Sequence, residues 1–300
     1  MPLSLILDSL VRSIQVGSLY ALMALGLTLT FAVMRFPNFA YAEYITVGAY
    51  AALLTSFWIS NIPLILAASL GAAALVAWVT HRAVFRPLAQ LKLSMYTLIL
   101  ASFAVGLILR YLIFLFVDAG GLFDKRIQVP LQVLVRTPNV VLTNIFFWTV
   151  PTVLGLVLVF SLLLARTDLG RQMRALADNE TLARAMGIRV ARVHDLTWLL
   201  VGGLAGVGGA FWGMYTSLNP LMGWITILSV FAASILGGMT SFGGTIAGAY
   251  LVAFSENLVM QWLNFQFGLD FTFKAAVPFV IIILVLLLRP QGLTQFRDST

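Results

Sequence analysis

The sequence predicts an all-α polytopic membrane protein with about eight or nine transmembrane helices, organised as a single transmembrane domain over residues 1–300. Hydrophobic residues make up 61% of the chain and charged residues 10%, against about 25% charged in a typical soluble domain. Apolar runs of about 18 residues or more recur along the chain, and each can cross a hydrocarbon core of about 30 Å. The absence of cysteine excludes disulfides and Cys-ligated metals.

The expected spans follow one another along the chain with short polar connections. In order they cover residues 14–34, 40–59, 62–80, 94–117, 145–165, 196–215, 224–236 with a continuation to about 263, and 271–288. The count varies between eight and nine because residues 35–44 and 224–244 interrupt the apolar pattern, as broken or re-entrant helices do. Within 196–215, the pairs Gly202/Gly206 and Gly209/Gly213 predict close helix packing.

Two longer polar segments separate the spans. Residues 118–144 contain glycines, prolines and a stretch of near-alternating polarity, and we expect an ordered extracytoplasmic loop with a short strand or interfacial helix. Residues 166–195 carry six arginines. In this second segment a short helix is expected from about Glu180 to Met186, outside the bilayer, because Asn179 is a good N-cap and Gly187 a good C-terminal stop.

Basic residues predict the orientation of the chain. With nine spans and a cytoplasmic C-terminus, the cytoplasmic segments are Arg35, 81–92, 166–195 and 289–300, which hold 12 of the 18 lysines and arginines. The net charge of +7 therefore reflects membrane orientation, and no nucleic-acid partner is expected. The helix in 166–195 is then either a lipid-associated basic helix or a docking helix for a cytosolic partner.

The sequence lacks the residue motifs that several kinds of enzymatic chemistry require. There is no GxxxxGK[ST] phosphate loop, so the chain is not expected to hydrolyse ATP by that route. The two histidines, His81 and His194, are expected in loops, and no HExxH motif is present. No enzymatic activity, cofactor or metal is expected. A passive or partner-driven conduit remains, or a secondary transporter.

Ionisable residues inside spans commonly mark a transport route. Glu43, Arg110 and Glu256 are the candidates, and each has two interpretations: a structural role, paired with a neighbouring helix or water, or a place in the substrate path. Exposed backbone at membrane depth also marks such a path. The candidate path residues are Asn38, Glu43, Gly238, Gly243 and Glu256.

Three segments at natural spacing resemble one known family. They are residues Gly17–Tyr50, with its Asn-Phe-Ala segment and nearby Glu, Ala175–Gly213, and Ser234–Leu258 with its SILGGMTSFGG sequence. Together they make the chain similar to the permease subunits of ABC importers for branched-chain amino acids and related polar compounds. The resemblance covers nearly the whole length.

This resemblance implies a set of partners in a bacterial or archaeal cytoplasmic membrane. They are a second, homologous permease, two cytosolic ATP-binding subunits and an extracytoplasmic solute-binding protein, besides membrane lipid. The arginine-rich segment would dock on the ATPase, and the candidate coupling residues are Asn179, Ala183, Arg184, Gly187 and Arg189. Ala183 and Gly187 match the last Ala and the Gly of the Glu-Ala-Ala-x-x-x-Gly pattern of ABC importers, while Thr181 and Leu182 depart from its first two positions.

Substrate and mechanism each have alternatives. The same permease pattern serves branched-chain amino acids, short-chain amides and urea. The competing class of protein is a stand-alone ion-coupled secondary transporter or channel for a small polar solute. Of the coupling residues, Ala183 and Gly187 lie four positions apart on one face, so we expect close packing there to matter more than any single arginine.

Overall fold

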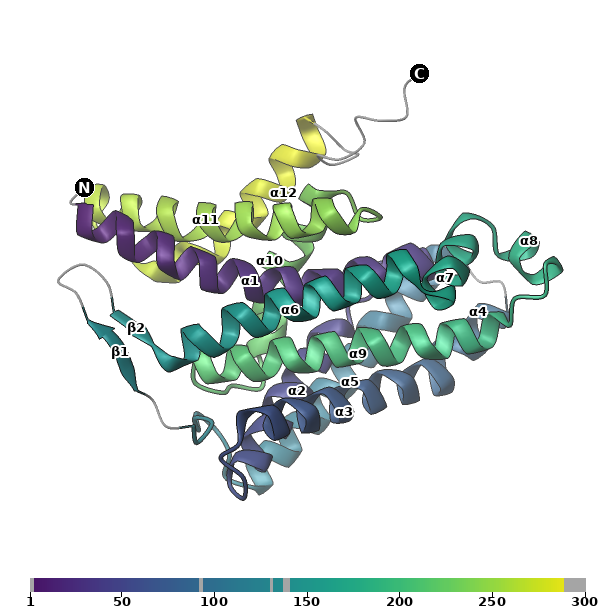
Figure 1. The fold of residues 1–300 in the computed structure, drawn as a ribbon, viewed down its shortest axis with the longest axis horizontal. Coiled ribbons are helices and arrows are strands. Elements are labelled where there is room, and N and C mark those ends of the chain that lie inside the picture. Colours follow the sequence, from purple (N-terminus) through teal and green to yellow (C-terminus); the bar gives the residue numbers. More distant parts are fainter. Residues whose placement is uncertain (1–2, 92–93, 130–131, 137–140, 289–300) are drawn as a thin grey trace. The chain divides into compact units, whose positions relative to one another are not determined.

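Helices form nearly all of the regular structure in the computed structural model, which describes residues 3–91, 94–129, 132–136 and 141–288. The helices are α1 (Leu3–Met34), α2 (Tyr41–Ser56), α3 (Ile62–Thr80), α4 (Arg86–Gln90), α5 (Met95–Ala119), α6 (Asn144–Arg166), α7 (Asp168–Asp178), α8 (Glu180–Ala185), α9 (Val190–Tyr215), α10 (Met222–Gly237), α11 (Phe242–Phe267) and α12 (Ala276–Leu288) (Figure 1). A π-helical turn, His81–Phe85, joins α3 to α4, and a 3-10 turn, Phe271–Ala275, precedes α12.

The all-α membrane architecture is confirmed. Among the described residues, six helical stretches are long and apolar enough to cross a membrane: Leu5–Met34, Ile62–Gln90, Met95–Ala119, Asn144–Arg166, Val190–Tyr215 and Phe271–Leu288. Helices also form at the other expected spans, although α2 and α10 have only 16 residues each. The count of eight or nine spans stays a prediction, and the expected cytoplasmic C-terminus, residues 289–300, lies outside the described residues.

Polar side chains set many of the helix starts. Asn61, Ser94, Thr167, Asn179 and Ser241 each accept a hydrogen bond from the backbone amide three residues ahead, as N-caps do. Such capping residues can be recognised in the sequence, and they determine where α3, α5, α7, α8 and α11 begin.

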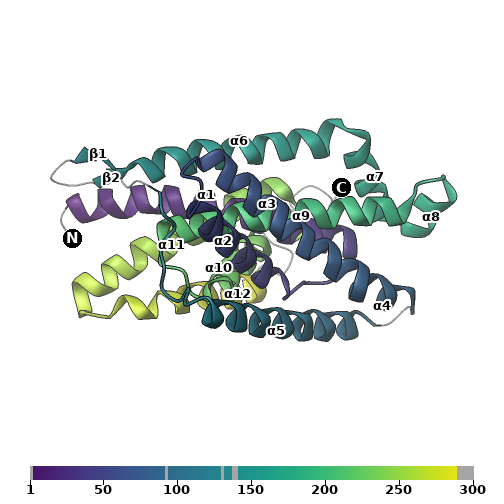
Figure 2. The same cartoon turned by 90° about the horizontal axis from the view of Figure 1, so that it is seen from below.

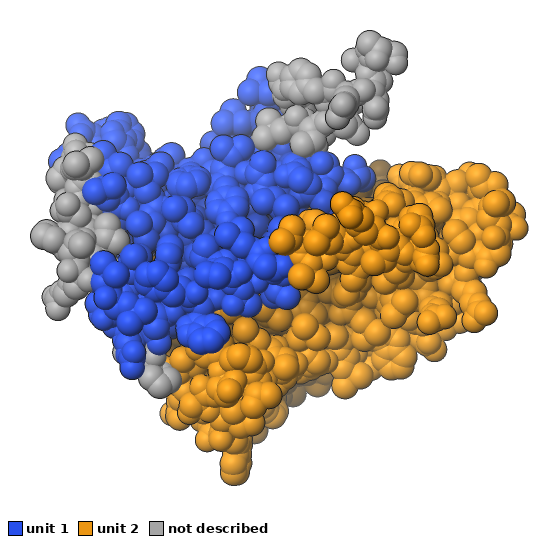
Figure 3. Space-filling model, viewed as in Figure 1, with its two compact units in different colours: residues 1–25, 130–157, 228–300 blue, residues 26–129, 158–227 orange. Residues whose placement is uncertain are grey.

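The chain divides into two compact units (Figure 3). One unit, which we call the arm-bearing unit, comprises residues 26–129 and 158–227. Its centre is formed by α2, α3 and α9, which pack against one another; α3 and α9 lie side by side in both views (Figures 1 and 2). A Cβ at Gly206 would meet the carbonyl oxygen of Ser69, and one at Gly209 would meet that of Ile45. The small residues therefore permit the close packing that the sequence predicts.

An aromatic stack joins α9 to the π-helical turn in this unit. The indole ring of Trp198 stacks with the rings of both His81 and Phe85, with ring centroids 5.2 and 4.8 Å apart. His81 is 1% exposed, and His194 lies in the second turn of α9. The expectation that both histidines lie in loops is thus wrong, because the helices continue beyond the apolar sequence at both places.

The second unit comprises residues 1–25, 130–157 and 228–300. In it, Ser18 of α1 is hydrogen-bonded to Tyr250 of α11 at 2.9 Å. Two short antiparallel strands, β1 (Val133–Arg136) and β2 (Val141–Thr143), pair Val133 with Thr143. The short strand expected within residues 118–144 is therefore present.

Candidate functional site

The arginine-rich segment forms a polar arm, residues 167–189, that contains α7 and α8 (Figure 1). The sequence predicts α8 closely, since Asn179 caps it by accepting a hydrogen bond from the Leu182 amide at 3.0 Å. At the other end, Gly187 has a φ angle of +84°. The Ile188 amide donates to the Ala183 carbonyl and the Gly187 amide to the Arg184 carbonyl, which is the Schellman pattern of helix termination.

The exposed surface of α8 differs from the expected one. Ala183 is only 3% exposed and faces its own chain, whereas a Cβ at Gly187 would meet nothing within 4 Å. The side chains that stand free are Leu182, 61% exposed, and Met186, 77% exposed. They lie four residues apart, Leu182 in α8 and Met186 at its C-cap, and therefore form one apolar ridge. Arg184 is paired with Glu180 at 2.7 Å on the helix surface.

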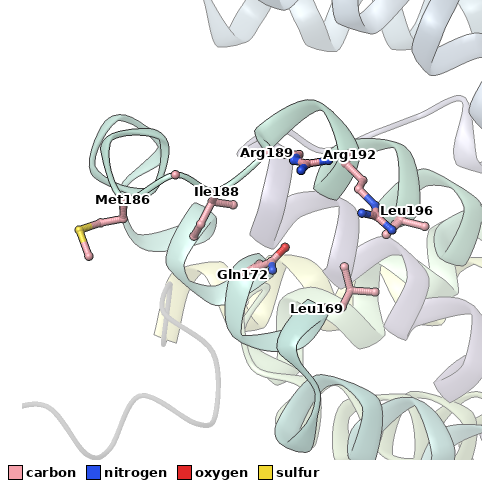
Figure 4. Close-up of a pocket in the computed structure, with 8 residues that line it drawn as sticks. Leu169, Gln172, Met186, Ile188, Arg189, Arg192 and Leu196 are labelled. Carbon is pink, nitrogen blue, oxygen red and sulfur yellow. The ribbon is translucent and has the colours of Figure 1, made fainter.

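A cavity of about 530 Å³ opens beside this ridge. Figure 4 shows side chains from α7 and α9 converging on it, together with Ile188 of the connecting segment. Arg189 and Arg192 supply positive charge, and Leu169, Ile188 and Leu196 supply apolar surface. Among the described residues that line the cavity, none has an acidic side chain, so its chemistry suits a group that is both anionic and partly apolar.

Hydrogen bonds and ion pairs hold the arm to the rest of its unit. Arg35, at the end of α1, donates to the Ala177 carbonyl in the last turn of α7. Arg82 makes a two-point contact with Asp195 of α9 at 2.8 and 2.6 Å. The buried face of α7 is formed by Gly170, Met173 and Leu176. The arm is thus fixed to the end of α1 and packs against α9, and the contact between Arg82 and Asp195 ties the π-helical turn to α9.

The break between α1 and α2 contains two of the predicted path residues. Asn38 and Glu43 are both 0% exposed. The Asn38 side chain accepts a hydrogen bond from the Ala40 amide at 3.1 Å and so shapes the turn. Phe39 donates its amide to the Ser102 hydroxyl of α5 at 3.1 Å, and Glu43 is paired with Arg110 of α5 at 2.7 Å. The break therefore lies against the middle turns of α5.

The break between α10 and α11 spans residues 238–241. Gly238 has a φ angle of +82°, while a Cβ at Gly243 would meet nothing within 4 Å. The two glycines consequently have different structural roles. Gly238 allows a backbone conformation that L-residues rarely adopt, whereas Gly243 leaves open space beside the first turn of α11.

Glu256 of α11 is 2% exposed and lies at the centre of a polar cluster. It accepts hydrogen bonds from Tyr20 at 2.9 Å and Ser229 at 2.5 Å, and the Lys274 ammonium lies 3.8 Å away. Lys274 also donates to Asn257 at 2.9 Å. The cluster joins α1, α10, α11 and the 3-10 turn, which supports the structural interpretation of this carboxylate.

Comparison with known sequences identifies the protein family of this chain. A family model described as "Branched-chain amino acid transport system / permease component" matches residues 9–286. This chain is a member of that permease family.

Two curated relatives match over nearly their full length. The permease is 32% identical to the probable branched-chain amino acid transport permease LivH of Methanocaldococcus jannaschii, over 93% of this chain and 89% of the relative. It is 28% identical to the high-affinity branched-chain amino acid transport system permease BraD of Pseudomonas aeruginosa, over 96% and 95%. Among solved structures, PsaBC from Streptococcus pneumoniae in complex with Fab shares the fold, with a TM-score of 0.50 and 15% identity over 96% of this chain and 92% of that one.

The predicted site residues of the permease form three separate groups. Asn179, Ala183, Arg184, Gly187 and Arg189 belong to the arm; Asn38 belongs to the first break and Glu43 to the first turn of α2; Gly238 belongs to the second break, and Gly243 and Glu256 to α11. Within the described residues, no group of three His, Asp or Glu side chains is placed to hold a metal ion.

Sequence reasoning missed the helix α7 and the ridge of Leu182 and Met186. The signal for α7 was present, because Thr167 is a good N-cap and Leu169, Met173 and Leu176 follow helical spacing. The ridge carried no such signal, since Ala183 and Leu182 are adjacent and only the orientation of α8 decides which one faces outward.

Proposed function

We propose that this permease carries branched-chain amino acids, or related small polar compounds, inward across a bacterial or archaeal cytoplasmic membrane. It would do so with a second, homologous permease, two cytosolic ATP-binding subunits and an extracytoplasmic binding protein. The match to the permease family over residues 9–286 carries this proposal. The names of the relatives, which specify branched-chain amino acids, favour that substrate class over amides and urea.

The arm is the proposed point of contact with the ATP-binding subunits, and its segment 166–195 is the proposed cytoplasmic coupling loop. Leu182 and Met186 would enter an apolar groove on the partner, and an acidic side chain of the partner would reach Arg189 and Arg192 in the adjoining cavity. Ala183 would act from within, because its small side chain lets α8 pack against its own unit. Asn179 and Gly187 would fix the two ends of the helix.

The attachment of the arm explains how movement would be transmitted. Arg35 ties α7 to the end of α1, and the contact between Arg82 and Asp195 ties the π-helical turn to the start of α9. A displacement of α8 would therefore act on α9 directly and on α2 and α3, which pack against α9. Closure of the ATP-binding subunits would therefore move α2, α3 and α9 at the centre of the arm-bearing unit.

Reconstitution into liposomes tests the function. The complete complex, with binding protein and radiolabelled leucine, is expected to take up leucine only when ATP is present on the cytoplasmic side. The permease alone, under a proton or sodium gradient, is expected to take up none. Uptake by the permease alone would favour the competing class, a secondary transporter or channel, and overturn the importer assignment.

The coupling surface has its own test. Met186→Glu and Leu182→Glu should abolish co-purification of the ATP-binding subunits, because each places a charge in an apolar contact. Arg184→Ala should have little effect, since exposed ion pairs contribute only about 0–1 kcal/mol. Leu91→Glu is the matched control, being an exposed leucine, 68% exposed, beyond the end of α4. Intact co-purification in both glutamate variants would exclude the ridge as the contact.

A further inference from the structure

The ion pair between Glu43 and Arg110 has an unusual geometry. Both Nε and Nη2 of Arg110 donate to the same carboxylate oxygen, Oε1 of Glu43, at 2.9 and 2.7 Å. The other oxygen, Oε2, is buried and accepts no hydrogen bond from any residue that the structure describes. An arginine and a carboxylate ordinarily meet through two oxygens, which satisfies both. Here Oε2 of Glu43 has no hydrogen-bond donor among the described residues, although the side chain is 0% exposed.

Arg110 lies within a helix that is long and apolar enough to cross a membrane, where bare polar groups are costly. Arg110 stands fifteen residues beyond the first residue of α5, which is about 22 Å along the helix axis. Glu43 stands in the first turn of α2, a helix that begins beside α5 instead of at a membrane surface. Interrupted helices at this depth are where transporters build sites for small polar solutes.

Two aromatic rings border the pair. The guanidinium of Arg110 lies over the ring of Trp224, 4.2 Å from its centroid. Phe103 contacts the same indole edge-on, with ring centroids 5.8 Å apart. Phe103 is 41% exposed and the Arg110 side chain 11% exposed, whereas Glu43 is fully buried. The surroundings thus combine one cation, one anion with a free oxygen, and an apolar wall.

We propose that the Glu43–Arg110 pair is a binding site for a zwitterionic amino acid, which parts the two residues as it passes. The substrate carboxylate takes the guanidinium of Arg110, and the substrate ammonium takes the carboxylate of Glu43, including Oε2. Phe103 and Trp224 contact the aliphatic side chain. This inference rests on the proposed function and narrows its substrate class.

Charge balance gives the site its selectivity. A zwitterion exchanges one ion pair for two, so no charge is left unpaired in the membrane interior. An amine would leave Arg110 without an anion, and an amide or urea would leave both residues without a charged partner. A site built to pair specific polar groups discriminates strongly against analogues that lack them. Amides and urea are therefore expected to be poor substrates.

The test uses the complete complex in proteoliposomes and the neutral double variant Glu43→Gln/Arg110→Gln. This variant removes both charges at once, so neither is left alone in the interior, and co-purification of the ATP-binding subunits shows whether it assembles. Leucine uptake should fall at least tenfold. Phe271→Leu, in the exposed 3-10 turn, serves as a control. Native leucine uptake in the double variant, with unchanged KM, would show that the pair only joins two helices.

A second measurement on the native complex covers the case in which the double variant does not assemble. A hydrophobic carbodiimide should label Glu43, and leucine should slow that labelling during ATP turnover, whereas isoamylamine and isovaleramide should not. Equal labelling with and without leucine would overturn the proposal. A native complex that takes up no leucine at all would instead refute the proposed function, so the two failures are distinguishable.

Discussion

The amide of Ile188 donates a hydrogen bond to the carbonyl oxygen of Ala183 at 3.1 Å, and this bond closes the C-terminal end of α8. It forms because Gly187, between them, adopts a φ angle of +84°. The same turn sends the chain into α9 only three residues later, at Val190. The orientation of α8 relative to α9 therefore depends on the conformation of a single glycine.

Gly187→Ala is expected to loosen α8 without creating a clash. The space around Gly187 is open, so the cost is that of a left-handed conformation, roughly 1–2 kcal/mol for an L-residue. Amide hydrogen exchange at Gly187 and Ile188 should accelerate, and co-purification of the ATP-binding subunits should decline. Gly155→Ala, at another open glycine but within helix α6, is the matched control and should be neutral. Native exchange rates in Gly187→Ala would contradict the role given to this turn.

The sequence was sufficient for the ends of α8, and the reason is local. Asn179, Glu180 and Gly187 act on atoms only a few residues away, so their roles follow from residue type and spacing. The same holds for the interruptions at 35–44 and 224–244, which the structure places at residues 35–40 and 238–241. Boundaries set by local chemistry are therefore predictable from one chain.

Pairings between distant residues were not predictable in this way. Glu43 and Arg110 lie 67 positions apart, and Tyr20 and Glu256 lie 236 apart. The sequence indicates that such intramembrane groups need partners, but helix packing decides which partner each one meets. The burial of Ala183 and the exposure of Leu182 likewise depend on how α8 turns against its unit.

The hydrogen bonds to Glu256 are expected to stabilise the second unit. Tyr20→Phe removes one donor to a buried carboxylate, and hydrogen bonds to charged groups contribute about 1.5–3 kcal/mol. The solubilised permease should therefore unfold at lower temperature, as followed by tryptophan fluorescence. Tyr96→Phe, at a tyrosine that is 79% exposed, is the control.

The same variant separates the two interpretations of Glu256. If the carboxylate is structural, leucine uptake per folded Tyr20→Phe complex should match the native value. A loss of uptake per folded complex, with native unfolding temperature, would instead place Glu256 in the substrate path.

The two glycines of the α10–α11 break should respond differently to alanine. Gly238→Ala strains a φ angle of +82°, at a cost of roughly 1–2 kcal/mol, and should lower the yield of assembled complex. Gly243→Ala meets no atom within 4 Å and should assemble normally. A larger side chain, in Gly243→Leu, then tests the proposed path: assembly with reduced leucine uptake supports it, and assembly with native uptake removes Gly243 from the path.

The orientation of the permease follows from its basic residues and from the gathering of three basic segments in one unit. Arg35, the π-helical turn and the arm lie together, as shown by a second cavity of about 520 Å³ that Arg35, Phe85 and Asp178 help to line. The loop around Lys125 instead bonds to Leu218, at the opposite ends of α5 and α9 from the arm. We therefore predict that the arm is cytoplasmic and that residues 118–144 are extracytoplasmic.

Because the chain has no cysteine, single-cysteine labelling gives a clean test of this prediction. Lys125→Cys should react with a membrane-impermeant maleimide in intact cells, since its side chain is exposed on the proposed outer loop. Met186→Cys, at a position 77% exposed, should react only after the membrane is permeabilised, provided that the permease is expressed alone. Each variant thus serves as the control of the other. Labelling of Met186→Cys in intact cells would place the arm outside, where no ATP-binding subunit could reach the ridge of Leu182 and Met186.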